Sequence, residues 1–284
     1  MEKLIGNKTK ANVAVFISGR GSNLKSLIKY SKSKNSLFKI KLVISNKSNA
    51  AGLKYAIKSK IKFYVIKYKN VMNSEKKILK LLKKFSIDLI CLAGFMRILS
   101  KNFIKKFNKP ILNIHPSLLP LHRGPSPIVN TILAGDTETG VSIFVMDKGM
   151  DTGPILRQKT TPVYVHETGG ELTDRLSLEA ANMLVPTLVD WIKGDIEPTP
   201  QDNNLASYSK LLKKSDGALD FTEPAINLKR KIDAFNPWPL SFTTYKGKRL
   251  TLLEASVHDE LEATLDPGEI LYSPSGKKVL LGTT

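Results

Sequence analysis

Short apolar runs alternate with amphipathic segments along the first half of the chain. The apolar runs are rich in β-branched residues, as buried parallel strands are, and they cover residues 13–18, 40–45, 63–66, 88–94 and 111–115. The segments between them have helical spacing with lysine on the polar face, at residues 22–31, 50–59 and 74–86. This alternation predicts an α/β fold with a doubly wound, mostly parallel sheet, whose functional groups gather at the carboxyl ends of the strands.

The second half has a less regular pattern. Two further strands are predicted at 141–147 and 155–165, and leucines at helical spacing predict a helix over about 170–193. The stretch "KGDIEPTPQDNN" (193–204) holds two prolines and little apolar sequence, which is typical of a linker. A helix over 223–235 precedes short strands with glycine turns, which predict a small β-barrel.

These patterns divide the chain into a catalytic domain over 1–194, a linker over 195–209 and a C-terminal OB-like domain over 210–284. A chain of 284 residues is long enough for one large core and one smaller core. Because the strands stop at the last residue, we expect the barrel to be incomplete.

The charge changes abruptly near residue 120. Residues 1–120 hold 27 basic and three acidic residues, a net charge of +24, and the remaining 17 basic and 22 acidic residues give 121–284 a net charge of −5. The basic half is almost all lysine without interleaved aromatics, unlike a specific nucleic-acid groove. General attraction to polyanions and an AT-rich coding bias without functional meaning both stay open.

Composition favours a cytoplasmic protein. Cys91 is the single cysteine and no CxxC motif occurs, which fits a reducing compartment, and Cys91 is expected to be a small buried apolar residue. No uncharged apolar stretch is long enough to span a membrane, and the N-terminus lacks the pattern of a secretory signal.

A glycine-containing turn joins the first strand to the first helix. In "FISGRGSNLKSL", the backbone N–H groups near Gly19 and Gly21 are placed to bind a phosphate or carboxylate. A dinucleotide-binding fingerprint would require glycine where Leu24 stands, so NAD binding is disfavoured. The alternative is a tight turn in which Ser22 and Asn23 cap the helix.

The motif "NIHPSLLP" (113–120) places polar side chains at the end of a buried strand. Asn113 and His115 alternate, so both face the same side of the sheet. Pro116 forces the chain out of the sheet, and we expect it to expose the imidazole at the sheet edge. The loop "MDKGMDTGP" (146–154) adds two carboxylates after another strand.

An amide, an imidazole and a carboxylate suit acyl transfer to an amine. The Asn and a protonated His can stabilise an oxyanion, while the Asp orients the His and helps to remove the proton of the attacking amine. No GxSxG motif favours a covalent acyl-enzyme, and no paired ligand near His115 favours a metal. Coincidental placement stays the alternative, and we expect His122, His166 and His258 on loops or surfaces.

Asn113-x-His115 followed by Asp151 resembles the catalytic set of the 10-formyltetrahydrofolate-dependent formyltransferases, and "NIHPSLLP" with "DTG" is specific to that family. Residues 13–120, with "ISGRGSNLKSLI" and "LAGFMRILS", resemble glycinamide ribonucleotide formyltransferase. Residues 121–284, with "RGPSPI", "AGDTETGVSIFVMDKGMDTGPIL" and "AFNPWP", resemble methionyl-tRNA formyltransferase. The chain is therefore interpreted as a hybrid of two related halves.

The resemblance implies a folate co-substrate, 10-formyltetrahydrofolate, and no metal. Its catalytic residues would be Asn113, His115 and Asp151. The backbone of Arg97 and Leu99 would bond the pterin beside apolar side chains, so that the folate-binding set is Met96, Arg97, Ile98, Leu99, Asp147 and Gly149. The acceptor-binding set would be Gly21, Ser22, Asn23, Arg123, Lys210, Lys213 and Lys214.

The acceptor favoured by the sequence is initiator methionyl-tRNA. Lys210, Lys213 and Lys214 lie beside Tyr208 and form a path for RNA phosphates, although an ordinary solvated linker would contain the same residues. Glycinamide ribonucleotide, a purine-biosynthesis acceptor, is the alternative, because the "GRGSN" loop is intact and the insertion that tRNA-directed enzymes carry after the second strand is missing. A third alternative is an inactive hybrid that binds folate or RNA without catalysis. The oligomeric state is not predicted.

Overall fold

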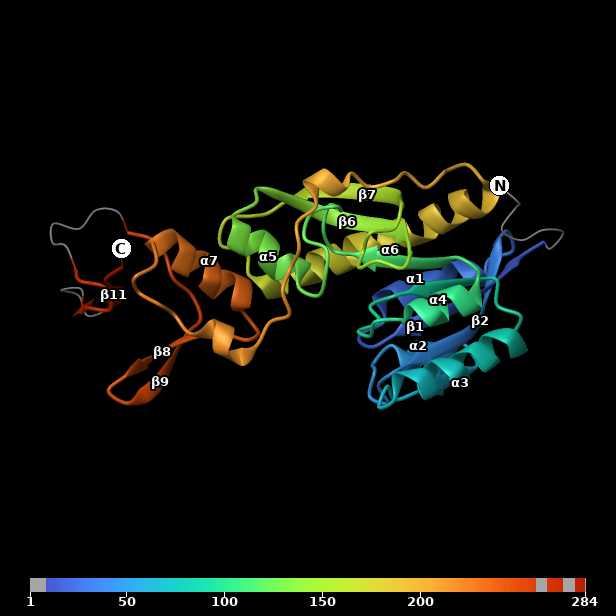
Figure 1. The fold of residues 1–284 in the computed structure, drawn as a ribbon, viewed down its shortest axis with the longest axis horizontal. Coiled ribbons are helices and arrows are strands. Elements are labelled where there is room, and N and C mark those ends of the chain that lie inside the picture. Colours follow the sequence, from blue (N-terminus) through green and yellow to red (C-terminus); the bar gives the residue numbers. More distant parts are fainter. Residues whose placement is uncertain (1–8, 259–264, 273–278, 284) are drawn as a thin grey trace. The chain divides into compact units, whose positions relative to one another are not determined.

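The computed structural model describes residues 9–258, 265–272 and 279–283 (Figure 1). The chain forms two compact units. Unit 1 consists of Met1–Arg123, Gly140–Thr160 and Arg175–Ser207, and unit 2 consists of Gly124–Thr139, Thr161–Asp174 and Tyr208–Thr284. Two short segments from the middle of the chain thus belong with the C-terminal segment, and the division predicted at 194 and 210 stays a prediction.

A seven-stranded sheet in the order β3-β2-β1-β4-β5-β6-β7 forms the centre of unit 1. Its first five strands are parallel: β1 (Ala11–Ile17), β2 (Phe38–Ser45), β3 (Phe63–Val65), β4 (Leu89–Leu92) and β5 (Ile111–His115). The next strand, β6 (Glu138–Val145), runs antiparallel to β5, and β7 (Ile155–Pro162) ends the order. The predicted doubly wound, mostly parallel sheet is therefore confirmed.

The helices predicted between the strands are also present, as α1 (Ser22–Ser31), α2 (Leu53–Lys58) and α3 (Val71–Lys84), and so is the long predicted helix, α6 (Gly169–Lys193). Two helices were not predicted, α4 (Lys101–Phe107) and α5 (Pro127–Ala134). The first is short, and the second is largely apolar and contains β-branched residues, so neither has a clear amphipathic period.

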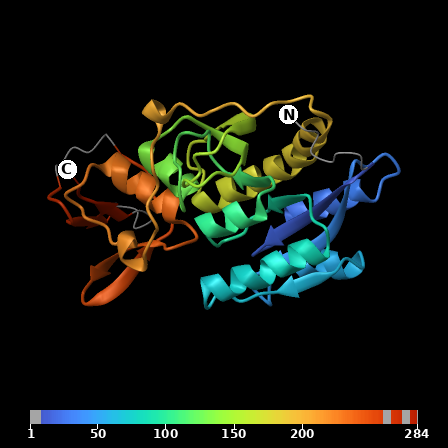
Figure 2. The same cartoon turned by 45° about the vertical axis from the view of Figure 1, so that its right-hand side comes forward.

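Two helices cover one face of the central strands. Alternate residues of β1, β2 and β4 face α3 and α4, which lie along the same side of the sheet (Figures 1 and 2). Buried side chains from these two helices fill that face, among them Ile78, Leu82, Phe103 and Phe107. A sheet covered by helices needs continuous apolar strands, which is the pattern seen in the sequence.

Unit 2 joins two helices and two small sheets. Helix α5 packs on α7 (Ala225–Phe235), and β8 (Ser241–Tyr245) forms an antiparallel hairpin with β9 (Lys248–Leu252). A second antiparallel pair contains β10 (Ile270–Tyr272) and β11 (Val279–Leu281). Parts of the C-terminal stretch that was predicted to hold short strands lie outside the described residues, and the OB-like barrel stays a prediction.

Among the described residues, no helix combines the length and the hydropathy that a membrane span requires, even though α6 has 25 residues. The cytoplasmic location and the lack of a metal stay predictions.

The glycine turn after β1 packs directly on the start of α2. Gly21 has a φ of +79° and caps α1 from the left-handed region, and a Cβ added there would lie 2.5 Å from the Gly52 Cα. The Gly52 N–H donates to the Gly19 carbonyl at 3.0 Å. Position 21 therefore needs glycine both for its conformation and for space, whereas a Cβ at Gly19 would meet nothing within 4 Å.

We predict that Gly21→Ala lowers the free energy of unfolding by about 2 kcal/mol or more, because it adds left-handed strain and a backbone clash. Gly19→Ala is the matched control and should change it by less than about 0.5 kcal/mol. Denaturant titrations of the two variants measure both values. Equal losses at the two positions would contradict the packing described for this turn.

Candidate active site

The His115 side chain is buried at the end of β5. Asn113 and His115 pair with Phe144 and Ser142 of β6, and they lie on the same face of the strand. The prediction that Pro116 exposes the imidazole is wrong, because His115 is only 4% exposed.

The burial of His115 has a local cause in the turn that follows it. The chain leaves the sheet after β5 but folds back at once, held by the Ser117 hydroxyl, which donates to the Leu121 carbonyl at 2.6 Å. The Ser142 hydroxyl donates to the Ser117 carbonyl, also at 2.6 Å. This turn brings the His122 carbonyl to 2.9 Å from the His115 Nε2. Backbone therefore covers the imidazole that the sequence was expected to expose.

The two nitrogens of His115 have different partners. A carbonyl oxygen can only accept, so Nε2 carries a proton and donates to His122. The other nitrogen, Nδ1, lies 3.6 Å from the Asp151 Oδ2. Burial lowers the pKa of the imidazole below its ordinary value, and this effect outweighs the Asp151 carboxylate, which raises it. The resting site thus favours a neutral imidazole rather than the protonated one expected from the sequence.

The Asp151 loop must turn back to reach His115. Because β6 is antiparallel to β5, the loop starts beside the beginning of β5, where the Met146 N–H donates to the Ile111 carbonyl at 2.8 Å. Four residues of strand, about 13 Å, separate Ile111 from His115. Asp151 itself is left-handed, with a φ of +54°. The position of its carboxylate therefore depends on how the loop is held.

Contacts inside this loop make it compact. The Asp147 Oδ1 accepts from the Gly149 N–H at 2.8 Å and from the Thr152 hydroxyl at 2.7 Å. A Cβ at Gly153 would lie 1.8 Å from the Val145 carbonyl oxygen, so only glycine fits. These contacts explain the aspartate and the glycines of "MDKGMDTG" structurally, and the predicted folate contacts of Asp147 and Gly149 stay predictions.

A buried arginine and a linker glutamine hold the loop from outside. Arg123 is 1% exposed, and its guanidinium donates to the Gln201 Oε1 and the Asn203 Oδ1. The Gln201 amide in turn donates to the carbonyls of Asp151 and Gly153 at 2.9 and 2.7 Å. Gln201 was not predicted, and the predicted contact of the buried Arg123 with the acceptor stays a prediction.

The predicted folate segment follows β4 and is partly open. Met96 and Ile98 are 72% and 84% exposed, whereas Leu99 is buried. The Met96 N–H donates to the Ser18 hydroxyl at 2.8 Å, and the Arg97 N–H donates to the Phe95 carbonyl at 2.9 Å. The predicted pterin contacts of this segment stay predictions, and its two exposed apolar side chains provide a surface that a flat ring can cover.

Comparison with known protein families identifies the family to which the chain belongs. Residues 11–188 match the model of the formyl transferase family, and residues 211–284 match the model of the formyl transferase C-terminal domain. The chain belongs to the formyl transferase family.

Relatives of this formyl transferase fall into two groups. The chain is 40% identical over 195 residues to the methionyl-tRNA formyltransferase of Roseiflexus sp. (strain RS-1), covering 69% of this chain and 60% of that protein. Identity to the enzyme of the same name from Myxococcus xanthus is 38% over 202 residues, with coverages of 71% and 64%. The chain thus spans less than two thirds of these relatives.

Solved structures of phosphoribosylglycinamide formyltransferases form the second group. The structure from Anaplasma phagocytophilum has a TM-score of 0.61 and 35% identity, covering 68% of this chain and 95% of that one. The structure from Brucella melitensis has a TM-score of 0.60 and 34% identity, with coverages of 67% and 100%.

The glycine turn predicted to bind a phosphate leads into α1, and its contact with a phosphate stays a prediction. Gly21 is the N-cap of α1, and as a glycine it offers no side-chain acceptor to the first turn. Ser22 and Asn23 thus do not cap the helix as the alternative interpretation required. The Asn23 Oδ1 is buried without a hydrogen-bond partner among the described residues.

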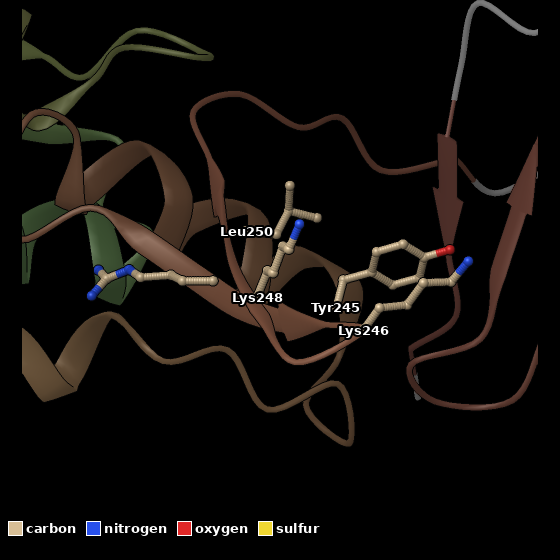
Figure 3. A pocket seen from close by; sticks show the side chains of 5 residues that line it. Tyr245, Lys246, Lys248 and Leu250 are labelled. Atoms are coloured by element: carbon tan, nitrogen blue, oxygen red, sulfur yellow. The ribbon is translucent and has the colours of Figure 1, made fainter.

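The predicted linker lysines Lys210, Lys213 and Lys214 are exposed in unit 2, as is Tyr208. The sequence reasoning missed a second basic surface of that unit, the hairpin of β8 and β9. Its pocket is shown in Figure 3, and it is lined by Tyr245, Lys246, Lys248, Arg249 and Leu250.

Cations of this hairpin lie against aromatic rings. The Lys246 ammonium is 5.3 Å from the centroid of the Tyr245 ring, and Figure 3 shows the two side chains side by side. The Arg249 guanidinium is 3.6 Å from the centroid of Phe242. Basic and aromatic residues interleave here, in "SFTTYKGKR", which is the pattern that was found missing in the N-terminal half.

We predict that His115 makes stability fall on the acid side. Unfolding restores the pKa of the imidazole to its ordinary value of 6.5, so below that pH the unfolded chain binds more protons than the folded one. The free energy of unfolding therefore falls as the pH drops below about 6.5, and this group has no effect above it.

The test is denaturant unfolding at several pH values between about 5 and 8. His115→Gln, whose amide can still donate to the His122 carbonyl, should have a shallower slope below pH 6.5 than the parent. His166→Asn is the control, since His166 is exposed and asparagine tolerates its left-handed φ of +66°. An unchanged slope for His115→Gln would contradict a buried neutral imidazole.

Proposed function

We propose that this formyl transferase moves the formyl group of 10-formyltetrahydrofolate to the amino group of initiator methionyl-tRNA. The observation that carries the proposal is the Asp151 carboxylate 3.6 Å from the Nδ1 of a buried imidazole, with Asn113 on the same strand face. The methionyl-tRNA formyltransferases among the relatives and the match to the C-terminal domain of the family support this choice of acceptor.

The reaction exchanges one C–N bond for another. The amine nitrogen attacks the formyl carbon, and the carbonyl electron pair moves to the oxygen, where the Asn113 amide can donate a hydrogen bond. Collapse of the tetrahedral intermediate breaks the bond to N10 of the folate. The amine loses one proton and N10 gains one, so no oxidant, reductant or covalent enzyme intermediate is needed.

His115 and Asp151 provide the route for that proton. A neutral imidazole has a lone pair on Nδ1 because Nε2 is bound to the His122 carbonyl. Nδ1 can therefore accept the amine proton, directly or through water, and the adjacent carboxylate stabilises the imidazolium that forms. Burial strengthens this ionic interaction, because little water screens it.

The folate would lie on the segment after β4. Exposed Met96 and Ile98 offer apolar contact to the pterin, and the backbone of Arg97 and Leu99 offers hydrogen bonds. Asp147 and Gly149 remain proposed neighbours of the folate, since they belong to the loop that carries Asp151.

The acceptor residues proposed for tRNA lie in unit 2. The linker lysines and the β8–β9 hairpin present ammonium and guanidinium groups next to exposed tyrosines, which suits phosphate contact and stacking on unpaired bases. Their residues are Tyr208, Lys210, Lys213, Lys214, Tyr245, Lys246, Lys248 and Arg249.

Glycinamide ribonucleotide is a second candidate acceptor. The uncapped first turn of α1 at Gly21, Ser22 and Asn23 suits a phosphate, and the similar solved structures carry the corresponding name. The third interpretation, an inactive hybrid, is less well supported, because the seam between the two halves leaves His115 and Asp151 close together.

We predict that Asp151→Asn lowers the turnover of formyl-folate and methionyl-tRNA by 10²- to 10⁴-fold, about the range for loss of general acid–base catalysis, because the imidazolium that forms on His115 loses its stabilising carboxylate. Asparagine tolerates the left-handed backbone at this position, so the fold should be unchanged. The affinity for the folate should stay within about twofold of the parent. Asp195→Asn, which removes an exposed carboxylate of the same unit, is the control. Near-normal turnover in Asp151→Asn would refute the proposed role.

We predict that changing Lys210, Lys213 and Lys214 together to alanine weakens the salt dependence of tRNA formylation. The slope of log kcat/KM against log salt should become shallower by about one per lost phosphate contact. Changing Lys76, Lys77 and Lys80 on α3 is a matched control that removes the same charge from unit 1. Equal slopes for the two triple variants would contradict the proposed RNA path.

A further inference from the structure

We propose that Gln201 is a positioning residue for formyl transfer, which holds the Asp151 carboxylate beside His115 by binding the backbone of the loop. The inference rests on the proposed function. Gln201 lies between the two segments that match the family models, residues 11–188 and 211–284, so neither match includes it.

The Gln201 amide is fully used. Its Nε2 donates to the carbonyls of Asp151 and Gly153, one on each side of Thr152, at 2.9 and 2.7 Å. Its Oε1 accepts from the Nε and a terminal nitrogen of Arg123, at 3.1 and 2.7 Å. A guanidinium can only donate and a carbonyl can only accept, so these four bonds allow a single orientation of the amide.

Arg123, which binds the oxygen of this amide, is itself held in place. Its guanidinium is buried, and its backbone N–H donates to the Ser207 carbonyl at 2.9 Å. The preceding residue, His122, supplies the carbonyl that binds the Nε2 of His115. One short segment therefore fixes the imidazole directly and the carboxylate through Gln201, so both members of the pair share the same support.

The loop needs such support for two reasons. Asp151 occupies the left-handed region, which strains the backbone of a residue other than glycine. The loop also begins at the opposite end of β5 from His115, so its path alone does not determine where the carboxylate lies. A misplacement of about 1 Å in a catalytic group can cost about 10²-fold in rate.

Gln201→Glu distinguishes the bonds to Arg123 from the bonds to the Asp151 loop. The carboxylate keeps the shape and can still accept from Arg123, but it has no N–H for the carbonyls of Asp151 and Gly153. We expect kcat to fall about 10- to 100-fold while both KM values stay within about threefold. The arginine stays paired, but two carbonyls lose their donor and face a carboxylate oxygen, so some thermal stability is lost and kcat is compared at a temperature at which both proteins are fully folded.

Asp202→Ala is the matched control from the next position of the linker. It removes the carboxylate that accepts from the Asn204 N–H at 2.9 Å, and this cap does not touch the loop. Turnover in this variant should stay within about twofold of the parent. The inference would be overturned if both variants lost the same stability and the same kcat, because the loss of kcat would then follow from stability alone.

A second readout does not need activity. The pKa of His115 is measured by NMR with and without Asp151→Asn, in the parent and in the Gln201→Glu background, as a double-mutant cycle. Because Asp151 raises this pKa, Asp151→Asn should lower it, and by less where Gln201 no longer holds the loop. The negative charge that Gln201→Glu introduces is present with and without Asp151→Asn, so its own effect on the pKa cancels in the cycle.

The outcomes separate the two proposals. A parent protein without formyl transfer refutes the proposed function, while the NMR cycle still decides whether Gln201 positions Asp151. Equal pKa changes in the two backgrounds, or an unchanged kcat in Gln201→Glu, overturn the inference. If Gln201→Glu does not fold, Gln201→Met, which is neutral and of similar length, takes both measurements.

Discussion

The hydrogen bond from the His115 Nε2 to the His122 carbonyl is the constraint on which the site depends. It assigns the tautomer, buries the ring under backbone and turns the remaining nitrogen toward Asp151. Desolvation then keeps the imidazole neutral, because the charged form loses more hydration than the carboxylate returns. At neutral pH the ring therefore rests with a lone pair on Nδ1, which is what the proposed removal of a proton from an attacking amine requires.

The Asp151 carboxylate is held in place by a part of the chain that is distant in sequence. The antiparallel direction of β6 starts the Asp151 loop far from His115, and a glutamine from the segment after α6 ties the loop down through Arg123. Polar side chains that are fully hydrogen-bonded specify one arrangement. Loop and linker therefore form part of the same site, although many residues separate them in the sequence.

Much of this could be predicted from the sequence, and the rest could not, for physical reasons. Strand alternation and helical spacing are local, so the sheet, α1 and the shared face of Asn113 and His115 followed directly. The burial of His115 depends on a turn whose bonds involve Ser117 and Ser142, and residue types alone do not reveal such contacts. The Gln201 network joins positions up to 78 apart, at Arg123, and no periodicity marks it.

The most direct test of the account is a comparison of two acceptors with the purified protein and 10-formyltetrahydrofolate at low salt. One is initiator methionyl-tRNA and the other is glycinamide ribonucleotide, each assayed for kcat/KM in the parent and in Asp151→Asn. The account predicts efficient, Asp151-dependent formylation of the tRNA and much slower formylation of the nucleotide. Efficient formylation of glycinamide ribonucleotide with the tRNA left unmodified, or transfer that does not need Asp151, would contradict it.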